Sequence, residues 1–412
     1  MITPSTCPPV VSESALAGSV DAALAAAAGW TDYLLHAVRQ GKGPAHVGME
    51  LGRWWMAMTH RRRPQWSTEH EIVWETPIMR LRDFSEGSRE RVVPTLVLPP
   101  QAGHDSCIVD YSPGQSQMQT IRAAGLTRLY SLDWIGATQA TKHTTIDDYI
   151  AVLGHAIEEI GGPVNLVGDC QGGWLATIYA ALHPEDVNTL TIAGAPIDFH
   201  AGEPVIGGYV ELFQPTFYQG LVASGGGVLK GEYLLGGFVA IKPHDEVSRQ
   251  LELLKHLGEP EHTERYAHFE NWFKHTQDLP GDFYLWVVEH LFRRNSLVTG
   301  ELEVGGDRVD LGRLRCPVQL LAGAEDHITP PPQVFRTADF VSTPEEHITT
   351  RLASGGHLGL FMGRESLRDH WPPVMVEVAR HSKPSVKPRA AAAAANARDV
   401  TDPGTPPQLP VP

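Results

Sequence analysis

The segment Val164–Leu182 constrains the fold of this chain more than any other. It reads VNLVGDCQGGWLATIYAAL, a buried strand followed by a tight turn and an amphipathic helix. The turn needs Gly168 and Gly172, because a bulky side chain at either place would collide with the strand-to-helix backbone. Cys170 is thereby held in a strained position at a helix N-terminus, where the positive end of the helix dipole stabilises a thiolate.

Strands and helices alternate on both sides of this turn, which predicts βαβ units and a parallel sheet. The continuous apolar run VVPTLVLPP is typical of a strand that is buried on both faces. The alternation stops for roughly a hundred residues after VNTLTIAGAPID and resumes at CPVQLLAG. We therefore expect an α/β fold with a mostly parallel, doubly wound sheet and a helical cap insertion.

These patterns divide the chain into expected parts. They are an N-terminal helical segment (1–65), the first part of the core (66–198), the cap (199–300), the second part of the core (301–382) and a disordered tail (383–412). Glycine clusters and many aromatic residues in the cap are typical of a lid over an apolar substrate. A helical subdomain that packs its aromatic residues internally is the alternative.

Composition argues against several classes of protein. A net charge of -15 does not suit a nucleic-acid binder. There is neither a signal peptide nor an apolar run long enough to span a membrane, so we expect a cytoplasmic protein. The cysteines are scattered without metal-binding spacing, and no nucleotide or metalloprotease motif occurs, so we expect no cofactor and no metal. The four cysteines are Cys7, Cys107, Cys170 and Cys316.

An acid and a histidine follow Cys170 in the chain order that a nucleophile at such a turn requires. Asp326 comes just after the buried strand of LLAGAEDHITP, and His357 lies on the glycine-rich loop of LASGGHLGLFMG. His357 would take the thiol proton and Asp326 would fix its tautomer. Each residue alone would more often be structural, but together they indicate acyl transfer through a covalent intermediate.

The oxyanion of this reaction needs N–H donors. The candidates are Gln171, directly after the nucleophile, and Gly103 or His104 in the loop QAGHDS, for which a plain turn is the alternative. The cap offers aromatic residues as walls of an apolar channel above the cysteine: Trp272, Phe273, Tyr284 and Trp286.

From about residue 65 to 380 the chain resembles the polyhydroxyalkanoate enzymes of the α/β-hydrolase superfamily, which are polymer synthases and intracellular polyhydroxybutyrate depolymerases. GDCQGGW is similar to the G-x-C-x-G-G box of the synthases. The block from DLPGDFYLW to AEDHITP is similar to the one that leads to their catalytic aspartate and the following histidine. By that likeness Cys170, Asp326 and His357 form the triad, and His327 is an auxiliary histidine.

Other stretches are more similar to the depolymerases, among them AGHDS, GAPID and GGHLGLFMGRESLRDHWPP. The chain departs from the pattern of the depolymerases at some positions and from that of the synthases at others. Gly172 stands where depolymerases tend to have proline, and His275 stands where synthases have an aspartate after a cap tryptophan. The Asn-Lys pair that synthases have after PP is absent here.

The resemblance implies an enzyme that acts on polyhydroxyalkanoate esters through an acyl-cysteine, with hydrolysis favoured. Polymerisation of 3-hydroxyacyl-CoA is the alternative, and a non-catalytic granule-associated protein is a second one. Expected partners are the polymer or its oligomers, 3-hydroxyacyl-CoA and the granule surface. The length of the hydroxyacyl side chain and the presence of a homodimer stay open.

Overall fold

The computed structural model describes residues 27–85, 92–203, 205–241 and 243–382. Cys7 and the tail expected at 383–412 lie outside the described residues. No helix within the described ranges is long and apolar enough to cross a membrane.

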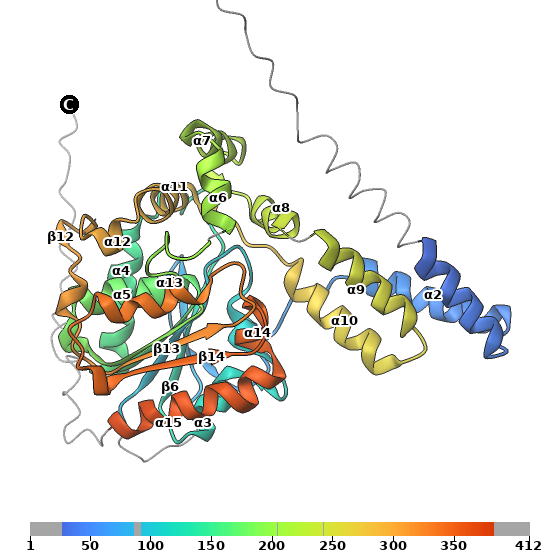
Figure 1. Cartoon of the computed structure of the whole chain (residues 1–412), viewed down its shortest axis with the longest axis horizontal. Helices are drawn as coiled ribbons and strands as arrows, with labels where there is room; N and C mark the ends of the chain where they lie inside the picture. Colours follow the sequence, from blue (N-terminus) through green and yellow to red (C-terminus); the bar gives the residue numbers. More distant parts are fainter. Residues whose placement is uncertain (1–26, 86–91, 204, 242, 383–412) are drawn as a thin grey trace, which may run out of the picture.

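A sheet of eight strands runs through the centre of the described chain, in the order β1-β2-β6-β3-β7-β8-β13-β14 (Figure 1). β1 pairs with β2, and β2 with β6, in antiparallel fashion, whereas all later neighbours are parallel. The strands are β1 (Glu71–Glu75), β2 (Met79–Asp83), β3 (Thr95–Leu98), β6 (Leu129–Trp134), β7 (Val164–Asp169), β8 (Val187–Ala193), β13 (Val318–Gly323) and β14 (Ile348–Ala353). This topology confirms the predicted sheet and is that of the α/β-hydrolase fold.

Helices cover both faces of the sheet because its central strands are apolar on both sides. In β3, Leu96 and Leu98 belong to one hydrophobic cluster and Val97 to the other, as the alternation of a strand requires. α4 (Ile146–Ile160) and α5 (Gln171–Leu182) pack on the first face. α3 (Gln117–Ala123), α14 (His357–Met362) and α15 (Trp371–His381) pack on the second.

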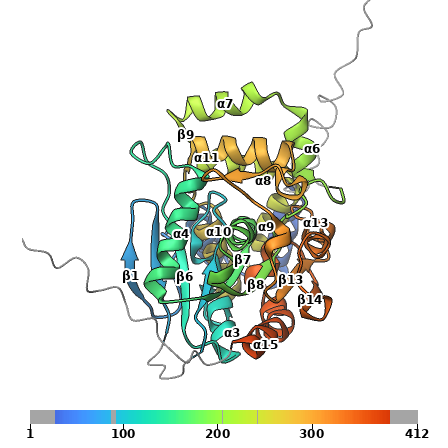
Figure 2. The ribbon, with the colours of Figure 1, turned by 90° about the vertical axis from the view of Figure 1, so that its left-hand side faces the viewer.

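The long insertion between β8 and β13 is mostly helical, as the interrupted alternation predicts. It contains α6 (Val205–Leu212), α7 (Pro215–Ser224), α8 (Gly231–Ile241), α9 (Pro243–Lys255), α10 (Pro260–Phe273), α11 (Gly281–Trp286) and α12 (Ser296–Thr299), with β9 (Val228–Leu229) paired to β10 (Leu279–Pro280). Figure 2 shows α6, α7 and α11 gathered at one end of the sheet. The backbone of residues 277–278 bonds to the loops after β3 and β6, so this is the end where the parallel strands finish.

An N-terminal pair of helices packs on the insertion rather than on the sheet. Residues 27–39 are helical and are followed by α2 (Pro44–Thr59). Tyr33 and Ala57 share a buried cluster with Leu253, Leu257 and Tyr266 of α9, α10 and the turn between them. In Figure 1 these helices form an arm that extends to one side of the core. The first and the middle parts of the sequence therefore stabilise each other.

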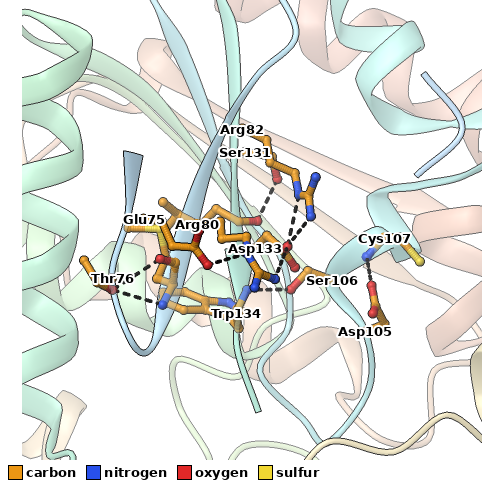
Figure 3. Close-up of polar contacts among 12 residues, drawn as sticks. Glu75, Thr76, Arg80, Arg82, Asp105, Ser106, Cys107, Ser131, Asp133 and Trp134 are labelled. Atoms are coloured by element: carbon orange, nitrogen blue, oxygen red, sulfur yellow. Dashed lines mark hydrogen bonds and ion pairs between the residues drawn. The ribbon is translucent and has the colours of Figure 1, made fainter. Parts of the chain in front are cut away.

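A buried ion pair joins β2 to β6 near the loop after β3 (Figure 3). The buried carboxylate of Asp133 accepts hydrogen bonds from Nε and Nη2 of Arg82 at 3.0 and 2.6 Å. Burial raises the pKa of Asp133 above its usual value, and the charge of Arg82 opposes that rise. The adjacent N–H of Trp134 donates to Ser106 Oγ at 2.9 Å. This stretch of β6 thus anchors the short helix η1 (Ser106–Val109), which follows the loop.

We predict that Arg82→Met lowers the free energy of unfolding by about 3–5 kcal/mol near neutral pH, because Asp133 would stay buried without its partner. Losing Arg82 raises the folded-state pKa of Asp133 further. A carboxyl group whose pKa is raised by folding destabilises the fold as pH rises through that pKa. The destabilisation should therefore shrink as pH falls, which urea titrations at several pH values would measure.

Arg80→Met on the same strand is the matched control. The Arg80 guanidinium lies 3.7 Å from the Asp133 carboxylate, and its side chain is 27% exposed, so its removal should cost no more than about 1 kcal/mol. Equal losses in the two variants, or a loss that does not vary with pH, would contradict the role given to Arg82.

Candidate active site

The turn between β7 and α5 has the strained backbone that the sequence predicts. Cys170 has φ 50° and ψ -118°, and it is one of two non-glycine residues with positive φ in the described part of the chain. A Cβ on Gly168 would lie 2.4 Å from the Cα of Gly173, and one on Gly172 would lie 2.0 Å from the carbonyl oxygen of Leu98. Both glycines are therefore required, which confirms the prediction, and the strain of about 1–3 kcal/mol fixes the sulfur at the start of α5.

His357 and Asp326 meet at the end of two adjacent parallel strands. Asp326 follows β13, and His357 is the first residue of α14 after β14. His357 Nδ1 lies 2.7 Å from Asp326 Oδ2, and both residues are buried. The other carboxylate oxygen of Asp326 accepts N–H bonds from Ile328 at 2.9 Å and Thr329 at 2.8 Å. Both carboxylate oxygens of Asp326 are thus hydrogen-bonded. Because Asp326 engages Nδ1 of His357, Nε2 is left for another partner.

Cys170 is 9% exposed and lies close enough to His357 to affect the pKa of its imidazole. Burial by itself lowers the pKa of His357, but the charges of Asp326 and Cys170 and hydrogen bonds to both raise it well above its usual value. Opposite charges on a thiolate and an imidazolium stabilise each other. Asp326 and Cys170 therefore both act on the imidazole of His357 and favour its protonated form.

The two other described cysteines lie in surroundings that favour the neutral thiol. Burial raises the pKa of Cys107 well above its usual value, and the nearby charge of Asp105 adds to the rise. Burial raises the pKa of Cys316 to about 11. Neither Cys107 nor Cys316 is therefore suited to act as a thiolate near neutral pH.

The candidate oxyanion donors flank the cysteine on two elements. Gln171 is the first residue of α5, so its N–H has no acceptor within the helix. Gly103 has φ +83°, and its carbonyl accepts the N–H of Gln277 at 2.8 Å, which ties the loop after β3 to the insertion. Burial lowers the pKa of His104 to about 4, so its ring is neutral. Which of Gly103 and His104 donates to the oxyanion stays a prediction.

The structure separates the four cap aromatic residues. Trp272 and Phe273, at the end of α10, share a buried cluster with Cys170 and stack on the ring of His104. Trp272 Nε1 also donates to the carbonyl oxygen of Asp105 at 2.9 Å. Partly buried side chains of α8 pack against the same cluster.

Tyr284 and Trp286 lie elsewhere. Trp286 packs on Trp174 of α5, on the other face of the sheet, and Tyr284 packs near Tyr218 of α7. Trp286 connects the insertion to the core, and Tyr284 connects two helices of the insertion. Neither residue belongs to the cluster that contains Cys170. His327 is half-buried in the loop beside Asp326, and its auxiliary role stays a prediction.

Sequence reasoning missed Asp169, which precedes Cys170. It is 0% exposed, and burial raises its pKa well above the usual value. Its Oδ1 accepts a hydrogen bond from Gln117 Nε2 at 3.2 Å. The available signal was an acidic residue at the end of the otherwise largely apolar strand VNLVGD.

One group within the described ranges has the ligand types and spacing for a metal ion: His183, Glu185 and Asp186. It follows the last residue of α5, whereas Cys170 precedes the first. A helix of 12 residues is about 18 Å long, so this group lies far from the cysteine. It has no evident connection to the chemistry of Cys170.

Comparison with curated proteins shows distant homology to polymer-forming enzymes. The chain is 28% identical over 326 residues to the poly(3-hydroxyalkanoate) polymerase subunit PhaC of Haloferax mediterranei, which covers 77% of this chain and 65% of that protein. It is 26% identical over 300 residues to the PhaC subunit of Allochromatium vinosum, which covers 71% of this chain and 82% of that protein. The chain thus spans just under two thirds of the first relative.

Among solved structures, the monoacylglycerol lipase of Paleococcus ferrophilus is 15% identical with a TM-score of 0.41, covering 71% of this chain and 98% of that one. A family model described as "Protein of unknown function (DUF3141)" matches residues 84–370, a span that contains Cys170, Asp326 and His357. This span is well over half of the sequence. The chain therefore belongs to the DUF3141 family and is a distant relative of the polyhydroxyalkanoate polymerase subunits.

Proposed function

We propose that this protein is an acyltransferase that polymerises 3-hydroxyacyl-CoA into polyhydroxyalkanoate. The observation that carries the proposal is the buried set of Cys170, His357 and Asp326, in which Cys170 belongs to an apolar cluster with Trp272 and Phe273. The printed names of the relatives, which are polymerase subunits, support the same direction. The sequence alone favoured hydrolysis with polymerisation as its alternative, and the relatives support the alternative better.

The first half-reaction loads the enzyme. Cys170 Sγ attacks the thioester carbonyl carbon of 3-hydroxyacyl-CoA, and His357 Nε2 takes the thiol proton. A carbon–sulfur bond to Cys170 forms, the carbon–sulfur bond to CoA breaks, and His357 returns the proton to the CoA sulfur. Asp326 keeps the Nδ1–H tautomer in place and stabilises the imidazolium.

The second half-reaction extends the polymer. The hydroxyl group of another 3-hydroxyacyl unit attacks the acyl-cysteine carbonyl, and His357 takes the hydroxyl proton. An ester bond forms, the bond to Cys170 breaks, and the proton returns to the sulfur. In each half-reaction the N–H of Gln171 and one from the loop with Gly103 and His104 would stabilise the oxyanion.

Exclusion of water separates this reaction from hydrolysis, because water and a hydroxyl chain end compete for the same acyl-cysteine. Cys170 is only 9% exposed and shares a buried apolar cluster with Trp272 and Phe273. An acyl-enzyme formed there would meet an apolar chain more readily than bulk water. The apolar cover therefore supports transfer over hydrolysis.

We predict that Cys170→Ala abolishes CoA release from 3-hydroxybutyryl-CoA, by at least about a thousandfold, because it removes the sulfur that would carry the acyl group. Cys316→Ala is the matched control and should keep the wild-type rate. CoA release is measured together with acid release from amorphous polyhydroxybutyrate. Acid release from polymer without CoA release would show a depolymerase, and neither activity would show a non-catalytic protein.

We predict that Phe273→Ala raises the fraction of acyl-enzyme resolved by water several-fold, because it opens the apolar cover of Cys170. The measurement is free 3-hydroxybutyrate formed per CoA released. Phe217→Ala on α7 is the control, since Phe217 is 42% exposed and outside the cluster that contains Cys170. If both variants change the ratio equally, the cover is not what excludes water.

A further inference from the structure

Asp169 is a buried carboxyl group beside the nucleophile that the proposed reaction does not use. It is the last residue of β7, lies opposite Ala193 of β8, and is 0% exposed. Its Oδ1 accepts a hydrogen bond from Gln117 Nε2 at 3.2 Å. Gln117 is the first residue of α3 and is also 0% exposed. A carboxyl group and a primary amide thus form a pair that water does not reach.

This pair has more acceptors than donors. Among the described residues, neither Oδ2 of Asp169 nor Oε1 of Gln117 has a hydrogen-bond partner. An ionised carboxylate is only an acceptor, and one amide N–H donates to Asp169 among the described residues. A proton on the carboxyl group removes a buried charge that this single bond would otherwise have to stabilise.

The surrounding charges are few. The imidazolium of His357 on α14 acts on Asp169 and favours its ionised form, as does the amide of Gln117, but burial outweighs both. The thiol of Cys170 is next in the chain, and its thiolate would repel a second negative charge. On the sheet side β8 contributes Ala193, which does not titrate. The balance favours the neutral acid.

We infer that Asp169 carries a proton in the resting enzyme, so that Asp326 is the ionised carboxylate that acts on His357. This inference rests on the proposed roles of Cys170 and His357. An ionised Asp169 would place negative charge beside the Cys170 thiol and oppose its deprotonation. It would also hold the proton on His357 more tightly, which would impair proton return to the leaving group. A neutral acid avoids both effects while filling the same space.

Infrared difference spectroscopy of the wild type and Asp169→Asn tests the proton directly. Near neutral pH, the wild type should show the carbonyl band of a protonated carboxylic acid, shifted in deuterium oxide and lost in the variant. Absence of this band would overturn the inference. The measurement needs no substrate, so it decides the state of Asp169 even if the protein fails to release CoA from 3-hydroxybutyryl-CoA, which would refute only the proposed function.

The pH dependence of Cys170 alkylation by iodoacetamide, followed by mass spectrometry, gives a second readout. The midpoint of the acid limb should be the same in the wild type and Asp169→Asn, because one neutral group replaces another. A shift to lower pH by about half a unit or more would mean that a negative charge was removed, and would overturn the inference. Asp326→Asn, which removes an ionised group, should move the profile and so shows that the assay detects such a charge.

Gln117→Met keeps the inference testable if Asp169→Asn does not fold. It removes the amide partner but leaves the acid, so the infrared band should persist at a shifted frequency, with a lower melting temperature. A band at the wild-type frequency would contradict the pairing, and loss of the band would contradict the proton on Asp169.

Discussion

The tight turn between β7 and α5 is the constraint on which the rest of the site depends. Because Gly172 touches the carbonyl of Leu98, the turn can close only when β3 lies directly beside β7. The same pairing brings the loop after β3, with its candidate oxyanion donors, next to the nucleophile. The strain at Cys170 is sustained by a parallel sheet whose central strands are buried on both faces.

Cys170, His357 and Asp326 are ionisable, and burying them would be costly if they did not interact with one another. Desolvation disfavours an imidazolium, but Asp326, anchored by two backbone N–H groups, lies at Nδ1 of His357, and Cys170 also favours the protonated ring. Each charge therefore has a partner. The neutral state inferred for Asp169 follows from the same rule, since that carboxyl group has an amide and no cation in hydrogen-bond contact.

The sequence predicts those features that depend on local pattern and on the order of elements. Glycines around Cys170 predict the turn, and alternation of strands and helices predicts the sheet. Because β13 and β14 are parallel neighbours, residues after each strand, Asp326 and His357, are expected to meet. The sequence pattern does not indicate toward which part of the fold a helix presents its side chains. Aromatic content alone therefore did not distinguish Trp272, which shares a cluster with Cys170, from Trp286, which packs on α5.

The same limit explains why the sequence did not decide between hydrolysis and polymerisation. Both reactions use one acyl-cysteine and one proton carrier, so the motif is shared. The difference lies in what reaches the acyl group, which depends on how α8 and α10 lie over the end of the sheet. Of these two helices, α10 is held in turn by α2 and by residues 27–39. The reaction outcome is thus a property of contacts between distant parts of the chain, which no single segment encodes.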